Sequence, residues 1–207
     1  TWAVGDSVGI GTLLPGEYDL VFSCPPYADL ERYSDDPRDL STMGYAEFVK
    51  VYRQIIAASC AMLKNDRFAV FVVGDLRDKA GMYRGFVMDT ILAFRAAGLE
   101  LYNDCVLVTA VGSLPIRVGK QFDSSRKLGK THQNVLVFLN GDAGRSTAAC
   151  GEVDVDDLEM PECVAGSLAL CRRDVDGTVA EHYLMAASRT SPTYTSRRWS
   201  PTCCVIY

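Results

Sequence analysis

Residues 18–27 read YDLVFSCPPY, a mostly apolar run that ends on two prolines and an aromatic residue. The run from Tyr18 to Ser23 is apolar enough for a strand that is buried on both faces, as in a parallel sheet. Pro25 and Pro26 have no N–H and a fixed φ, so they cannot continue a sheet ladder. The chain therefore leaves the sheet in a stiff turn, which can hold Tyr27 and the Pro25 carbonyl in fixed positions.

Strand and helix patterns alternate around this strand up to residue 142. Residues 45–63 carry apolar side chains at helical spacing, and a second helix is expected over about 83–97. Residues 68–73 form a strong central strand that ends in a Gly-Asp turn. Two further strands, 101–111 and 134–139, are joined without a helical pattern, which favours an antiparallel pair at the sheet edge. The fold class is therefore α/β, a doubly wound sheet whose ligand crevice lies beyond the carboxyl ends of its strands.

The composition agrees with one α/β domain that has a real core. The chain has 207 residues, of which 48% are hydrophobic, and a net charge of −5. This net charge does not indicate a protein that binds polyanions, although a local basic face is enough for phosphate contact. No apolar run approaches the ~20 residues that span a bilayer, and the first residues, TWAVGDS, lack the layout of a signal peptide.

Eight cysteines are spread along the chain without a CxxC pair, and there are only two histidines. A structural zinc site is therefore not expected. Cys60 and Cys105 fall among apolar residues and are predicted to be reduced thiols in the core. Free thiols favour a cytoplasmic protein over a disulfide scaffold.

The character of the chain changes after residue 142. Residues 152–162 form an acidic run, and the last twenty residues are rich in Ser, Thr, Arg and Pro without a helical or strand period. Residues 1–142 are therefore predicted to form the domain, and residues 143–207 a weakly ordered tail. The acidic run is most simply a solvated segment.

Cys24-Pro25-Pro26-Tyr27 after a buried strand resembles the catalytic motif of amino-group DNA methyltransferases, in which Asp, Asn or Ser precedes Pro-Pro and an aromatic residue. The resemblance covers roughly residues 1–142. The loop ADLERYSDDPRDLS (28–41) is similar to phage- and plasmid-type members. The strand FAVFVVGDLRD (68–78) and the segment RKLGKTHQNVLVFLNGD (126–142) also resemble family motifs.

The resemblance implies an enzyme that moves a methyl group from S-adenosyl-L-methionine to the exocyclic amino group of adenine or cytosine in double-stranded DNA. An amine conjugated to its ring becomes reactive when acceptors take hydrogen bonds from its N–H groups. The Pro25 carbonyl is one such acceptor in the family's motif. The target base must be flipped out, which costs a few kcal/mol, and stacking on an aromatic ring, here Tyr27, returns roughly 1–3 kcal/mol.

Cys24 departs from the family's motif, because a thiol is a weak hydrogen-bond acceptor. Ser23 could replace it only if the turn were shifted by one residue. Cys24 could instead fill a small pocket, or act as a covalent nucleophile as in the cytosine-carbon methyltransferases. All three interpretations stay open at the level of sequence.

The resemblance also assigns cofactor contacts to Asp6 and Ser7 in the turn Gly5-Asp6-Ser7, and to Ser23 at the strand end. A turn or helix-cap role for Asp6 explains the same pattern. The family's glycine-rich cofactor loop is absent from the sequence, which favours an amino-terminally truncated fragment. The same absence, together with Cys24, favours the alternative of a catalytically inactive module that binds DNA or a partner.

A basic segment over residues 117–132 is the predicted contact to the DNA backbone. Glycines at 119 and 129 lead us to expect a mobile loop there, and a merely solvated loop is the alternative. His132 has no neighbour at metal-ligand spacing. The residues assigned to DNA are Arg117, Lys120, Arg126, Lys127 and Lys130.

Overall fold

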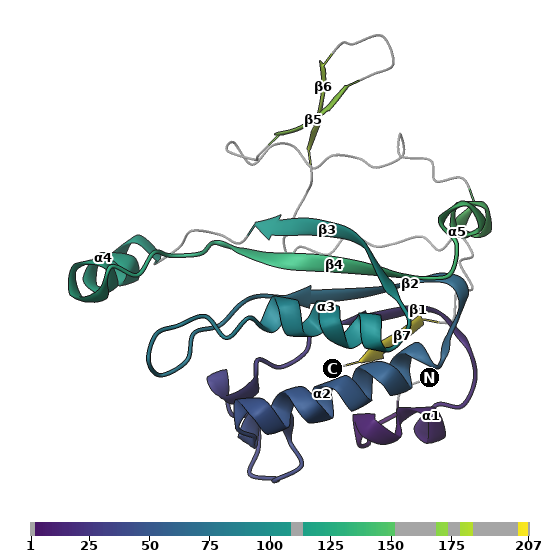
Figure 1. Cartoon of the computed structure of the whole chain (residues 1–207), viewed down its shortest axis with the longest axis horizontal. Helices are drawn as coiled ribbons and strands as arrows, with labels where there is room; N and C mark the ends of the chain where they lie inside the picture. The colour runs from purple at the N-terminus through teal and green to yellow at the C-terminus, as the bar shows by residue number, and fades with distance from the viewer. Residues whose placement is uncertain (1–2, 109–113, 152–168, 174–178, 184–202, 207) are drawn as a thin grey trace, which may run out of the picture. The chain divides into compact units, whose positions relative to one another are not determined.

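The computed structural model describes residues 3–108, 114–151, 169–173, 179–183 and 203–206. The chain divides into two compact units, Thr1–Cys150 with Trp199–Tyr207, and Gly151–Arg198. The first unit contains a five-stranded sheet in the order β3-β4-β2-β1-β7 (Figure 1). In the second unit, β5 (Ala169–Arg173) pairs with β6 (Val179–Tyr183) in antiparallel fashion.

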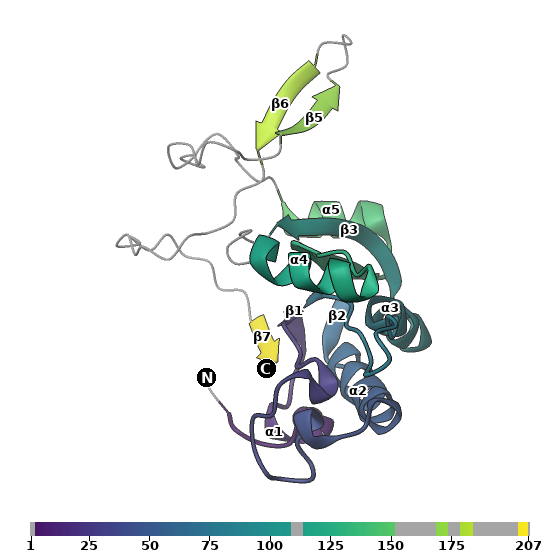
Figure 2. The ribbon, with the colours of Figure 1, turned by 90° about the vertical axis from the view of Figure 1, so that its left-hand side faces the viewer.

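The centre of the sheet is a parallel pair, β1 (Tyr18–Ser23) and β2 (Leu63–Val73). The helix α2 (Tyr45–Cys60) connects them, and α3 (Phe86–Ala96) follows β2. Both helices lie side by side on one face of the sheet (Figure 1). Because parallel strands joined by a helix run in the same direction, the carboxyl ends of β1 and β2 share one edge. Figure 2 looks onto this edge.

Short helices precede and follow β1 along the chain. The first two, η1 (Ser7–Gly9) and α1 (Ile10–Leu13), precede the strand. The other two, η2 (Ala28–Leu30) and η3 (Leu40–Thr42), lie between the strand and α2. They carry the chain from the sheet edge to the start of α2.

The hydrophobic core lies between the sheet and the two long helices. Alternate residues of the central strands face it, as the two-residue period of a strand requires, and Val21, Ala69, Phe71 and Phe138 are buried. The helices contribute a cluster of aromatic rings, all buried: Phe48, Tyr52, Phe86 and Phe94. The core therefore fixes β1 and β2, and with them the edge at which the Pro-Pro turn begins.

The predicted antiparallel strands are confirmed at the edge of the sheet. The strand β4 (His132–Asn140) pairs antiparallel with both β2 and β3 (Glu100–Val108). The expectation of a loop over 117–132 was wrong in its first part, because α4 (Leu114–Ser125) is helical. Residues at 114, 118 and 122 have the spacing of one helix face, and Gly119 only weakens such a pattern.

Two further expectations differ from the structure. The helix expected to reach residue 63 ends at Cys60, because Leu63 already pairs with Tyr18 and the Tyr18 N–H donates to the Met62 carbonyl at 2.8 Å. Cys60 is buried as predicted, but Cys105 is exposed, since it lies on the edge strand beyond a register shift. In the described part of the chain, Cys24, Cys60, Cys105 and Cys150 are free thiols.

Two elements beyond residue 142 belong to the first unit: α5 (Ala143–Cys150) and β7 (Cys203–Ile206), which runs parallel to β1. The division of the chain at residue 142 remains a prediction. The described residues contain no helix that is both long and apolar enough to cross a bilayer.

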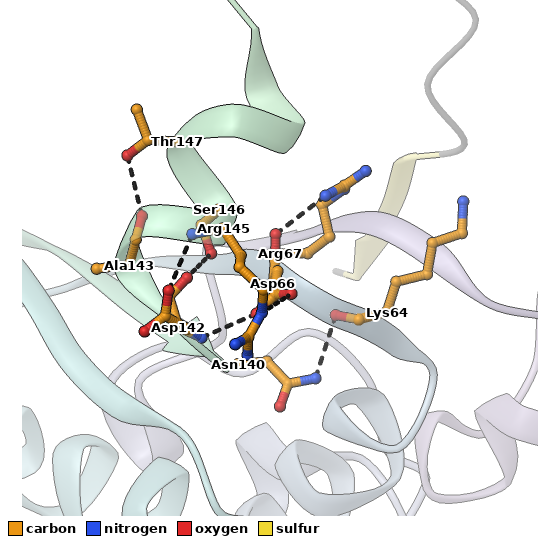
Figure 3. Close-up of polar contacts among 9 residues, drawn as sticks. All are labelled: Lys64, Asp66, Arg67, Asn140, Asp142, Ala143, Arg145, Ser146 and Thr147. Carbon is orange, nitrogen blue, oxygen red and sulfur yellow. Dashed lines mark hydrogen bonds and ion pairs between the residues drawn. The ribbon is translucent and has the colours of Figure 1, made fainter.

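A polar cluster fixes α5 to the start of β2 (Figure 3). Asp66, which has a φ of 58°, accepts hydrogen bonds from the Asp142 N–H at 2.8 Å and from Arg145 Nε at 2.8 Å. The amide of Asn140 donates to the carbonyl oxygens of Leu63 and Lys64. The Arg145 guanidinium, followed by the Asp142 N–H, lowers the pKa of Asp66.

Arg145→Leu is expected to raise the pKa of Asp66 toward its ordinary value, but not fully, because the Asp142 N–H remains. A lowered carboxyl pKa stabilises the fold above about pH 4, and this contribution is lost as the pH falls through the folded value. The variant should therefore lose less stability in acid than the wild type does. A carboxyl-carbon NMR titration measures the pKa of Asp66 in the wild type and the variant, with Arg95→Leu as the control. An unchanged titration would contradict the role of Arg145.

Candidate active site at the carboxyl edge of the sheet

The Pro-Pro turn follows β1 directly and presents residues of alternating exposure. Ser23 and Pro25 are buried, Cys24 is exposed, and Pro26 and Tyr27 are half-buried. The prolines leave no free N–H at the turn, so the strand ends without an orphan donor at these positions. The catalytic residues assigned from the sequence thus lie together at the sheet edge.

The backbone reverses immediately after the motif. Ala28 has a φ of 49° and is completely buried. A non-glycine residue in this region costs about 1–3 kcal/mol and persists only where its surroundings determine the conformation. The next residue supplies part of that constraint, because Arg84 Nη1 donates to Asp29 Oδ1 at 2.6 Å and the guanidinium lowers the pKa of Asp29. The end of the motif is thereby tied to the start of α3.

The ring of Tyr27 is held at both ends. Its edge-to-face partner is Phe86, with ring centroids 5.7 Å apart and an interplanar angle of 78°. Its hydroxyl accepts a hydrogen bond from Gln133 Nε2 at 2.6 Å. Burial raises the pKa of Tyr27, and the Gln133 amide and the Gly74 backbone act in the opposite direction. The phenol is therefore neutral at physiological pH.

A pocket of about 890 Å³ opens beside the turn. Cys24 and Pro26 line it together with Asp6 and Ser7 from the segment before β1, so the structure brings these predicted residues together. The loop after η2 also lines it, with Tyr33, Asp36 and Asp39 among the lining residues. Ser23 lines a much smaller neighbouring pocket of about 20 Å³, with Pro25 and Pro26.

The acidic side chains of this edge are partly engaged in turns. Asp6 Oδ1 accepts from the Val8 N–H at 2.9 Å, so the cap predicted as the alternative is present, while the residue also lines the larger pocket. Asp75 Oδ1 accepts from the N–H groups of Leu76, Gly85 and Phe86 at 3.0–3.1 Å. Asp75 therefore serves the loop and the start of α3.

The residues assigned to DNA lie on and after α4. Arg117 and Lys120 are in the helix, and Arg126 ends it with a φ of 56°. The Arg126 guanidinium lies 5.2 Å from the Phe122 ring centroid. Lys127 and Lys130 follow and are half-buried.

Lys127 reaches the loop after β2. A β-carbon placed at Gly81, where φ is 89°, would lie 2.6 Å from Lys127 Nζ. That loop adds cations that sequence reasoning missed, among them Arg77, whose guanidinium lies 3.9 Å from the Tyr83 ring centroid. In the described part of the chain, neither Arg77 nor Lys127 forms an ion pair.

Gln133 is the residue that sequence reasoning missed at the motif itself. It is the second residue of β4 and lies 106 positions from Tyr27. No local pattern marks it, because its partner is reached only through the pairing of β4 with β2. The segment that contains it was recognised only as a family strand motif.

Comparison with known proteins gives a likeness in solved structures only. No family model and no curated protein matches the sequence. PvuII DNA methyltransferase, which is cytosine-N4-specific, is 20% identical with a TM-score of 0.50, over 66% of this chain and 48% of that chain. A DNA modification methylase of Thermus thermophilus, TTHA0409, in complex with S-adenosyl-L-methionine, is 17% identical with a TM-score of 0.49, over 67% and 54%.

The chain spans about half the length of these solved structures. At such low identity the likeness shows the fold. It confirms the α/β fold class predicted from the sequence. The sheet is mixed, with the strand order β3-β4-β2-β1, and helices cover it. The chain thus has an α/β fold similar to that of a DNA methyltransferase.

Proposed function

We propose that this chain carries the catalytic motif of a DNA methyltransferase that moves a methyl group from S-adenosyl-L-methionine to the exocyclic amino group of adenine or cytosine. The observation that carries the proposal is the placement of the Pro-Pro-Tyr turn. It follows the parallel strand β1, of which Val21 and Ser23 are buried, holds Tyr27 half-buried, and borders a pocket of about 890 Å³. Such edges are where ligands bind in open α/β sheets.

The pocket beside the turn fits the proposed cofactor in size and charge. Ligand pockets have volumes of roughly 300–1,000 Å³. Asp6, Asp36 and Asp39 line this one, and carboxylates suit the positive sulfonium and amino groups of S-adenosyl-L-methionine. Arg38 pairs with Asp36 at 2.7 Å, and Asp39 accepts hydrogen bonds from Ser34 Oγ and the Ser41 N–H, so Asp6 is the carboxylate proposed to contact the cofactor. Ser7 and Ser23, which line the small neighbouring pocket, are the other proposed contacts. The bound cofactor would supply an activated methyl group.

The chain's own residues would hold the base and prepare its nitrogen. The Pro25 carbonyl is the proposed acceptor for one N–H of the target amine, because the turn fixes its direction before the base arrives. Tyr27 is the proposed stacking platform for the flipped base. Since its hydroxyl is bound by Gln133, the ring can offer a fixed plane.

Cys24 is proposed as a weak acceptor for the second N–H of the amine. It is exposed in the pocket wall, so it does not fill an enclosed cavity. Although the residue is exposed overall, partial desolvation of its thiol raises the pKa, which keeps it protonated at neutral pH. A protonated thiol is a poor nucleophile, which argues against the covalent interpretation.

Cys24→Ser is expected to raise the turnover of methyl transfer by up to about tenfold, because a hydroxyl is a better acceptor than a thiol. Cys24→Ala should lower it severalfold. Initial rates with saturating cofactor and DNA measure both. If serine instead abolished transfer as completely as alanine, Cys24 would be a nucleophile and the proposed role would be wrong.

The basic residues on and after α4 are the proposed contacts to the phosphates of double-stranded DNA: Arg117, Lys120, Arg126, Lys127 and Lys130. The two sides of the Pro-Pro-Tyr turn differ in charge. On the pocket side, Arg32 and Arg38 are paired with aspartates. On the other side, Lys127 from the segment after α4 reaches the loop after β2, which also contains Arg77, and among the described residues neither of these two cations forms an ion pair. DNA would therefore approach over Tyr27 from that side.

The test of the proposed function is incubation of the chain with methyl-labelled S-adenosyl-L-methionine and unmethylated genomic DNA. Label that enters DNA at a rate proportional to protein supports the proposal. DNA binding without any label in DNA, by a chain shown to be folded, would contradict it and favour the non-catalytic DNA-binding alternative.

A further inference from the structure

Tyr27 and Gln133 form a contact between the catalytic turn and the strand β4. Gln133 Nε2 lies 2.6 Å from Tyr27 Oη, and both side chains are partly shielded from solvent. The two residues lie far apart in the sequence: Tyr27 is in the turn after β1, and Gln133 is at the start of β4.

The third member of this contact is Gly74, at the end of β2. A β-carbon at this position would lie 3.6 Å from Gln133 Cγ and 3.7 Å from Tyr27 Oη. The tip of the phenol ring is therefore packed against two strands at once. Since β2 and β4 are paired up to Val73 and Asn134, this framework is rigid.

The other end of the ring is set by Phe86, the first residue of α3. The Phe86 N–H is itself held by Asp75, which fixes the start of that helix. The edge-to-face contact with Phe86 limits the tilt of the Tyr27 ring, and the hydrogen bond from Gln133 limits its swing about the side-chain torsions.

We propose that Gln133 is a positioning residue, which donates a hydrogen bond to the Tyr27 hydroxyl and so fixes the plane on which the flipped base stacks. This inference rests on the proposed function. It implies that Gln133 affects the turnover of DNA more than its binding, because phosphate contacts dominate affinity for the duplex. A small misplacement of a positioning group is enough to slow a reaction severalfold or more.

Two variants separate the hydrogen bond from packing. Gln133→Leu removes the donor and keeps a similar volume. Gln133→Glu keeps the shape, and its carboxylate can accept a hydrogen bond from the Tyr27 hydroxyl, as Asp89 does from the Tyr45 hydroxyl. Gln133→Leu should lower kcat for DNA about tenfold, with the KM for DNA changed less than about twofold, whereas Gln133→Glu should keep most of kcat. Gln54→Leu, an exposed glutamine on α2, is the matched control and should leave both constants unchanged.

A double-mutant cycle tests whether Gln133 acts through the Tyr27 hydroxyl. In the Tyr27→Phe background, Gln133→Leu should cause no further loss of kcat, because the hydrogen bond is already absent. Independent losses that multiply would contradict the inference.

A spectroscopic measurement tests the same contact without relying on activity. With 3-fluorotyrosine at position 27, a fluorine NMR titration reports the ionisation of this phenol alone. The Gln133 amide lowers the pKa of Tyr27, so Gln133→Leu should raise it, whereas Gln54→Leu should not. An unchanged titration in Gln133→Leu would overturn the contact.

The two proposals fail in different ways. If the wild-type chain transfers no label to DNA, the proposed function is wrong, whatever the fluorine titration shows. If the wild type transfers label and Gln133→Leu matches its kcat, the methyltransferase proposal stands and the positioning role is wrong.

Discussion

Tyr27→Ala is expected to lower the rate of methyl transfer about a hundredfold while changing duplex affinity by less than about twofold. Stacking of a base on an aromatic ring contributes roughly 1–3 kcal/mol, and about 2.7 kcal/mol corresponds to a hundredfold change in rate. The ring is half-buried, its hydroxyl accepts a hydrogen bond from Gln133, and it meets the Phe86 ring at an interplanar angle of 78°. Its removal would leave the flipped base without a platform, while the cations on and after α4 still bind phosphate.

Single-turnover rates with genomic DNA, together with duplex binding by fluorescence anisotropy, measure the two quantities separately. Tyr27→Phe keeps the ring and is the matched control; it should retain much more activity than Tyr27→Ala. Equal loss of rate in both variants would show that the hydroxyl, not the ring, is required. Unchanged transfer in Tyr27→Ala would exclude a stacking role altogether.

Phe94→Ala is expected to lower the free energy of unfolding by about 3–5 kcal/mol, the range for deleting a buried phenylalanine. Phe94 is completely buried, and its ring stacks on Phe138 with centroids 3.8 Å apart and meets Phe71 edge-on at 4.8 Å. It therefore joins α3 to both β2 and β4. Small domains have only about 5–15 kcal/mol in total, so this variant should be close to unfolded.

Denaturant unfolding measures the effect, and Leu92→Ala on the same helix is the control. Leu92 is 47% exposed, so its truncation should change stability by no more than about 0.5 kcal/mol. Similar losses in the two variants would mean that the aromatic cluster does not hold the sheet and helix together.

The sequence was sufficient to predict the elements whose pattern is local. The apolar run before the prolines, the central strand over 68–73 and the amphipathic helix that begins at Tyr45 were all predicted, because each shows its own period. The turn was also predictable from its residues. Pro25 and Pro26 restrict the backbone whatever surrounds them, which is why the candidate site was found at the end of β1.

Features that depend on contacts between distant residues could not be predicted. The strand β2 begins five residues before the strong apolar run, because its parallel pairing with Tyr18 extends it. Gln133 was missed because its role is visible only when β4 places it against Tyr27. The helix α4 was predicted to be a loop for a local reason, since its glycine and its charges hid a weak helical spacing.

The function of the site depends on chemistry at one atom of the nucleobase, so the most direct measurement identifies that atom. DNA treated with the chain and S-adenosyl-L-methionine is digested to nucleosides, and the methylated product is identified by mass analysis against authentic standards. We expect N6-methyladenine or N4-methylcytosine to accumulate with time and to fall about a hundredfold with Tyr27→Ala. Methyl groups found only on a ring carbon of cytosine, or no methylated nucleoside from a folded chain that binds DNA, would contradict the account.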